Sequence, residues 1–68
     1  MRQYTFPANL RRIRKERGLS QTMLAEMVGV SQVSISYYEK SVEYPTIDRV
    51  YDLARALNVD IEELISMH

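Results

Sequence analysis

The chain has 68 residues, which is enough for one small domain, and we predict a single domain over residues 1–68. It has no cysteine, which excludes disulfides and thiolate metal sites. Its apolar runs are far shorter than the roughly 20 residues of a membrane-spanning helix, and Met1–Phe6 is not an apolar signal segment. We therefore expect a soluble, cytoplasmic chain with no cofactor and no membrane partner.

The formal net charge is zero, but the charges are separated along the chain. Residues 1–17 carry six basic residues and one acidic residue, whereas residues 43–68 carry two basic and six acidic residues. A chain polarised in this way can present a positive face to phosphate groups. The basic segment is equally compatible with the solvated side of a helix, so charge alone leaves both interpretations open.

Apolar residues recur at helical spacing through the whole chain, and no stretch alternates for long enough to form a strand. The stripe formed by Phe6, Leu10 and Ile13 predicts a first helix that ends near Arg17, before Gly18. We predict an all-α, compact five-helix bundle.

The remaining helices are predicted from their N-caps. Ser20 is expected to begin a second helix, Ser31 a third that runs to about Lys40, and Thr46 a fourth. Asp60 followed three residues later by Glu63 predicts a capping box that opens a short fifth helix. The residues expected to face inward from helices two to four are Leu24, Ala25, Val28, Ile35, Tyr38, Ile47, Val50, Leu53, Ala54 and Leu57. Core or hinge packing is expected for Tyr4, Tyr38, Tyr44 and Tyr51.

Residues 21–40 combine two short helices with a very short connection, Gly29–Ser31. A steep crossing over so few residues needs a backbone with positive φ, which Gly29 adopts at low cost. It also needs a small residue where the helices meet, and Ala25 provides one. This segment therefore predicts a helix-turn-helix.

The outer face of the third predicted helix differs from an ordinary solvated surface, which would carry more Glu and Lys. It presents short hydroxyls, an amide, a branched aliphatic group and a phenol. Glutamine can bind adenine N6 and N7 together, and valine can contact a thymine methyl group. The residues of this face are Ser31, Gln32, Val33, Ser34, Ser36, Tyr37 and Lys40.

Residues 8–65 resemble the helix-turn-helix domain of the phage lambda repressor and Cro type, the XRE family. The resemblance rests on the segments Leu10–Gln21, Leu24–Ser31 and Pro45–Ile65, and on the third helix ending in YYEK. It implies a five-helix bundle that binds a double-stranded DNA operator as a two-fold homodimer. It also implies a transcription regulator and favours a repressor, with the third helix in the major groove.

The resemblance assigns a role to each site position. Base contacts are implied for Gln32, Val33, Ser36 and Tyr37. Phosphate contacts are implied for Gln21, Ser31, Ser34 and Lys40, of which Ser31 and Ser34 could also contact a nearby base. Arg14 and Glu39 occupy positions that form a structural ion pair between the first and third helices.

Several positions depart from the family pattern. Ser41 stands where glycine is usual, and Glu43 stands where a basic residue is common. Tyr37 is bulky for a base contact and could pack on a phosphate or sugar instead. Met23 and Met27 replace residues that are usually polar, and they form either a wider core stripe or an exposed patch for a partner protein.

The sequence has no nucleophile–base pair, no phosphate-binding loop and no metal-ligand cluster, so we do not expect an enzyme. Two functions from different classes remain. His68, the only histidine, is a terminal residue without ligand partners. The first function is the dimeric regulator, with a dimer surface expected at Val59, Ile61, Ile65 and Met67. The alternative is a protein-binding adaptor or antitoxin-type partner, which the zero net charge, Glu43 and the methionine pair favour.

Overall fold

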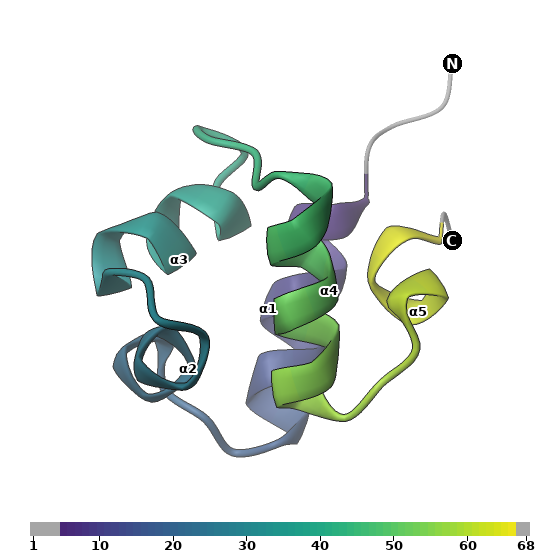
Figure 1. The fold of residues 1–68 in the computed structure, drawn as a ribbon, viewed down its shortest axis with the longest axis horizontal. Helices are drawn as coiled ribbons and strands as arrows, with labels where there is room; N and C mark the ends of the chain where they lie inside the picture. Colours follow the sequence, from purple (N-terminus) through teal and green to yellow (C-terminus); the bar gives the residue numbers. More distant parts are fainter. Residues whose placement is uncertain (1–4, 67–68) are drawn as a thin grey trace.

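The computed structural model describes residues 5–66, which form five α-helices and no β-strand (Figure 1). The helices are α1 (Phe6–Glu16), α2 (Gln21–Val28), α3 (Gln32–Glu39), α4 (Ile47–Leu57) and α5 (Ile61–Ile65). The all-α, five-helix prediction is confirmed. Tyr4, Met67 and His68 lie outside the described residues.

The predicted N-caps are confirmed for the last four helices. The side chains of Ser20, Ser31 and Thr46 each accept a hydrogen bond from the backbone N–H three residues later, at 3.0, 3.1 and 3.3 Å. The Glu63 carboxylate accepts one from the Asp60 N–H at 3.2 Å, as part of a capping box. These bonds satisfy N–H groups that have no partner inside the helix.

Two glycines end helices in the left-handed conformation, Gly18 with φ of +72° and Gly29 with φ of +82°. The Gly29 N–H donates to the Ala25 carbonyl at 2.8 Å, and the Val30 N–H donates to the same carbonyl at 3.0 Å. The chain therefore turns sharply after α2, and α3 begins within three residues. This is the predicted helix-turn-helix.

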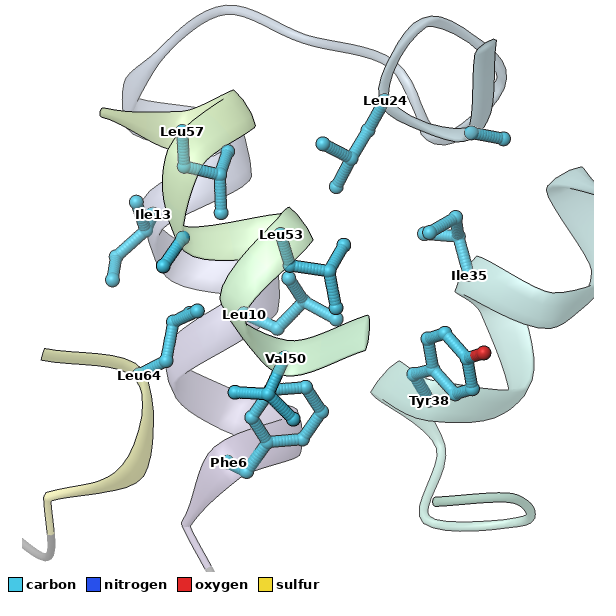
Figure 2. Close-up of a cluster of buried hydrophobic side chains, with 12 residues drawn as sticks. Phe6, Leu10, Ile13, Leu24, Ile35, Tyr38, Val50, Leu53, Leu57 and Leu64 are labelled. Carbon is cyan, nitrogen blue, oxygen red and sulfur yellow. The ribbon is translucent and has the colours of Figure 1, made fainter. Parts of the chain in front are cut away.

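The core lies between α1 and α4 and extends to the other three helices (Figure 2). The helix α1 packs against α3 and α5, while α4 packs against α2 and α5. The pair α2 and α3 thus lies on one side of the bundle and α5 on the other (Figure 1). The buried apolar residues are Phe6, Leu10, Ile13, Leu24, Ala25, Ile35, Tyr38, Val50, Leu53, Ala54, Leu57 and Leu64.

Ile47, predicted to face inward, is exposed, as are two of the tyrosines predicted to pack in the core or at a hinge. Ile47 is 61% exposed, because it is the first residue of α4 and precedes by one turn the first buried residue of that helix, Val50. Tyr44 and Tyr51 are 58% and 48% exposed, so neither lies in the core, and hinge packing is the remaining alternative for both. Apolar character does not require burial, since much of a folded protein's surface is apolar. Tyr38 is buried, as predicted.

A buried asparagine that the sequence analysis did not single out joins α5 to α1. Asn9 donates from its side-chain nitrogen to the carbonyl oxygens of Leu64 and Ser66, both at 2.9 Å. These carbonyls belong to the end of α5, where no intrahelical donor remains. Asn9 therefore caps α5 from the neighbouring helix.

Arg14 and Glu39 form an ion pair between α1 and α3. The Arg14 Nε atom lies 2.6 Å from Glu39 Oε2, and Nη2 lies 3.1 Å from Oε1. The two side chains are 9% and 3% exposed. Arg14 Nη1 also donates to the Leu19 carbonyl at 2.8 Å. The buried charges are thus paired in the two-pronged geometry that is strongest for arginine and a carboxylate.

Removing Glu39 alone should be far more damaging than removing both partners. We expect Glu39→Leu to lower the free energy of unfolding by about 3–5 kcal/mol, because Arg14 is left buried without its counter-charge. The double variant Arg14→Met/Glu39→Leu should recover most of that loss. Urea unfolding of both single variants and the double variant tests this. Additive losses in the double variant would contradict it.

Ser41 adopts the left-handed conformation with φ of +63°, at the position where glycine was expected. Such a backbone costs a non-glycine residue about 1–2 kcal/mol, partly offset by the greater freedom of glycine in the unfolded chain. We therefore expect Ser41→Gly to raise the free energy of unfolding by about 0.5–1 kcal/mol. Thermal unfolding should show a midpoint several degrees higher. A lower midpoint would show that Ser41 is not strained.

Candidate nucleic-acid interface

The outer face of α3 projects from the bundle, while its inner face lies in the core. Ile35 and Tyr38 are buried, whereas Gln32, Val33 and Tyr37 are exposed. The exposed fractions are 51% for Val33 and 42% for Tyr37, which are large for side chains with so much apolar area. Ser34 and Ser36 are half-buried on the same helix. The structure thus brings the predicted base-contacting residues together on one accessible helix.

A chain of hydrogen bonds connects the buried ion pair to this face. Gln21 donates from Nε2 to Glu39 Oε1 at 3.1 Å. Gln32 in turn donates from Nε2 to Gln21 Oε1 at 2.7 Å. Gln21, for which the family resemblance implies a phosphate contact, is half-buried at the start of α2 and connects these two groups. The orientation of an exposed glutamine is therefore fixed by a buried carboxylate.

Serines organise the first turn of α3. The Ser31 hydroxyl accepts from the Ser34 N–H at 3.1 Å and donates to the Ser34 hydroxyl at 3.2 Å. The proton of the Ser34 hydroxyl is therefore still available for another acceptor. The first N–H groups of a helix and its dipole favour a negative charge near this end.

Two arginines to which the sequence analysis gave no role cap helix C-termini from other helices. Arg49 of α4 donates to the Val28 carbonyl at 3.0 Å, at the end of α2. Arg17 donates to the Leu57 carbonyl at 2.8 Å, at the end of α4. These bonds hold α2 and the end of α1 against α4. Both guanidinium groups therefore have a structural role.

Tyr38 lies on the inner side of α3 and is buried beside the loop that follows. Burial raises the pKa of the Tyr38 phenol above its ordinary value, Glu43 raises it further, and Arg49 partly opposes them. The phenol is consequently neutral at physiological pH.

The methionine pair of α2 is exposed, so the interpretation of Met23 and Met27 as a wider core stripe is wrong. The two side chains are 46% and 55% exposed. Met27 borders an open hollow of about 370 Å³ between α2 and α4, together with Val28, Asp52, Arg55 and Ala56. The second interpretation of the pair, an exposed apolar patch, agrees with this placement.

Over residues 5–66, no group of His, Cys, Asp and Glu side chains is arranged to hold a metal ion. Within the same part of the chain, no helix combines the length and apolar character needed to cross a membrane.

Comparisons with known proteins give a consistent result. The family described as Helix-turn-helix matches residues 10–64. The chain is 37% identical over 59 residues to the HTH-type transcriptional regulator y4dJ of Sinorhizobium fredii, covering 87% of this chain and 77% of that protein. It is 36% identical over 61 residues to the cryptic phage CTXphi transcriptional repressor RstR of Vibrio cholerae, covering 90% of this chain but only 55% of that protein.

Solved structures agree with the sequence matches. The P22 c2 repressor in complex with a synthetic operator superposes with a TM-score of 0.84 at 33% identity, covering 90% of this chain and 92% of that one. SinR in its complex with the SinI protein superposes with a TM-score of 0.83 at 27% identity, covering 90% of this chain and 60% of that one. The relatives named here are transcription regulators or repressors. From its helix-turn-helix, its five-helix fold and these matches, the chain belongs to the lambda-repressor-like helix-turn-helix family of DNA-binding transcription regulators.

Proposed function

We propose that this protein is a cytoplasmic repressor that binds a palindromic operator as a homodimer, with α3 in the major groove of each half-site. The observation that carries the proposal is the accessible outer face of α3, on which Gln32 is held in place by Gln21 and the buried Glu39. A groove-binding helix needs side chains that are free to contact DNA and already oriented. The operator complex of the P22 c2 repressor and the repressor name of the Vibrio relative support it.

Gln32 keeps the donor and acceptor that a bidentate contact with adenine requires. One N–H of its Nε2 is used by Gln21. The second N–H can donate to adenine N7, and Oε1 can accept from the N6 amino group. Because the bond to Gln21 fixes the amide plane, less side-chain entropy is lost on binding. We therefore propose that Gln32 makes a bidentate contact with an adenine of the half-site.

The neighbouring exposed residues suit apolar and hydroxyl contacts. Val33 can contact a thymine methyl group, and Ser36 can bond to a base edge. Tyr37 can contact a base or pack on the sugar–phosphate backbone. With no charged side chain on the outer face between Gln32 and Tyr37, discrimination would depend on the amide and on methyl contacts.

Phosphate contacts would set the position of α3 in the groove. Ser31 and Ser34 lie at the N-terminal end of α3, and the exposed Lys40 lies at its C-cap. Gln21 lies at the first turn of α2, where backbone N–H groups favour an anion. These four residues would bind the backbone on both sides of the groove.

A single copy of this domain contacts one half-site, and two copies would bind half-sites about 34 Å apart, one helical turn. The dimer surface that we propose contains Val59, Ile61, Ile65 and Met67. In the described part of that surface, Ile65 is 42% exposed, whereas Val59 and Ile61 are half-buried against the core. Ile65 therefore offers most of the free apolar area there.

A second function, an adaptor that binds a protein partner, is favoured by one specific observation. Met23 and Met27 expose a soft apolar surface on α2 beside the hollow bordered by α4. A flexible thioether surface of this kind suits contact with another protein. The structural neighbour SinR is described in a complex with SinI.

Selection from random-sequence duplex DNA by the purified protein, followed by sequencing, separates the two functions. The regulator should enrich a palindrome whose half-sites are centred about 34 Å apart and contain a recurring adenine. Enrichment of a single, non-repeated site would reject the dimer and retain DNA recognition. No enrichment at low salt would reject the regulator and favour the adaptor.

Gln32→Ala should lose about 1–3 kcal/mol of binding free energy, concentrated at one base pair of the selected site. Lys40→Ala is the matched comparison, because a lost phosphate contact weakens binding to all sequences alike. Affinities for the selected site and for its single-base variants, measured by fluorescence anisotropy, distinguish these outcomes. Equal weakening of all sequences by Gln32→Ala would rule out a base contact by that residue.

A further inference from the structure

The helix-turn-helix itself carries little positive charge. Residues 21–40 contain one basic residue, Lys40, and two acidic residues, Glu26 and Glu39. Binding to a phosphate backbone depends strongly on cations, which release counter-ions from the DNA. Additional cations would have to come from outside this segment, and in the described part of the chain α1 packs directly against α3.

Most arginines of the described chain are engaged in internal contacts. Arg14 is buried against Glu39, Arg17 and Arg49 cap helix ends, and Arg55 bonds to Asp52 at 2.5 Å. Apart from Lys40, three exposed cations among residues 5–66 neither cap a helix end nor bond to Asp52, and all three lie on α1. They are Arg11, Arg12 and Lys15.

The two flanks of α1 are identified by residues with known partners. Arg14 points to α3, where it meets Glu39, and Asn9 points to α5, where it bonds to the Leu64 carbonyl. Residues three or four positions apart lie on the same side of a helix. Arg11, three positions before Arg14, therefore lies on the α3 flank. Arg12, three positions after Asn9, lies on the α5 flank.

The partners of the two arginines agree with this division. Arg12 contacts Glu16 on its own helix at 3.4 Å, and both side chains are about half exposed, which partly neutralises the charge of Arg12. Arg11 has no carboxylate within ion-pair distance among residues 5–66. Lys15 is four positions after Arg11 and three after Arg12, so it lies between the flanks, away from the core.

We propose that Arg11 binds a backbone phosphate of the DNA duplex that α3 contacts, and so supplies from α1 a cation that the helix-turn-helix lacks. The proposal rests on the proposed function. Arg11 lies one turn along α1 from Arg14, whose partner Glu39 directly precedes Lys40. Arg11 and Lys40 would then hold the DNA backbone from two elements joined by the buried ion pair.

The test compares Arg11→Ala with its matched control Arg12→Ala, which removes an equal charge from the opposite flank. Affinity for a random-sequence duplex and for the selected operator is measured by fluorescence anisotropy over a range of salt concentrations. Arg11→Ala should weaken binding to both duplexes and reduce the slope of log K against log salt by about one unit per protomer. Arg12→Ala should leave the slope unchanged, and Arg11→Lys should restore it, because the charge returns.

Each outcome decides the proposal. An unchanged slope for Arg11→Ala, or an equal reduction for Arg12→Ala, would overturn it while leaving DNA recognition by α3 intact. Failure of the unmodified protein to bind either duplex would reject the proposed function and this contact together. Circular dichroism shows whether each variant is folded, and because both arginines are exposed, both substitutions should retain the helical spectrum.

Discussion

The buried ion pair between Arg14 and Glu39 is the interaction on which the rest of this structure depends. Two charges with almost no solvent access must stay together, so the pair fixes the position of α3 relative to α1. Glu39 also accepts a hydrogen bond from Gln21, and Gln21 accepts one from Gln32. Through these bonds the buried ion pair restrains the exposed side chain of Gln32. The orientation of Gln32 follows from the packing of the bundle.

The zero net charge of the chain is consistent with DNA binding once the positions of the charges are considered. Arg14, Arg17 and Arg49 serve as internal donors to a carboxylate or to backbone carbonyls. They contribute to the fold and leave few cations for phosphate. Sequence specificity therefore does not depend on the net charge. Bases are distinguished by hydrogen bonds and methyl contacts, whereas phosphates are bound by a small number of local cations.

Local features could be predicted from the sequence, whereas features that depend on distant backbone groups could not. The caps at Ser20 and Ser31 and the turn at Gly29 involve atoms within a few residues of each other. The local sequence is therefore enough to predict them. Asn9, Arg17 and Arg49 donate to carbonyls between 21 and 57 positions away, and nothing in the local pattern identifies those acceptors.

The exposed apolar residues show a second limit of the sequence. Ile47 belongs to the apolar stripe of α4, yet the buried part of that stripe begins only one turn later, at Val50. Met23 and Met27 have helical spacing that suits burial equally well, and their exposure follows from how α2 packs on α3 and α4. At the candidate site, the sequence indicated which residues lie on the outer face of α3. The bonds that orient Gln32 required the structure.

The central claim is that the outer face of α3 enters a groove of duplex DNA. The most direct measurement is an NMR titration of ¹⁵N-labelled protein with its selected operator, recording the backbone amide shifts. The account predicts that the largest changes lie in residues 31–40, with further changes at Gln21 and Arg11 and small ones at Met23 and Met27. Changes concentrated on the methionine face of α2 or on α5, with α3 unaffected, would contradict it.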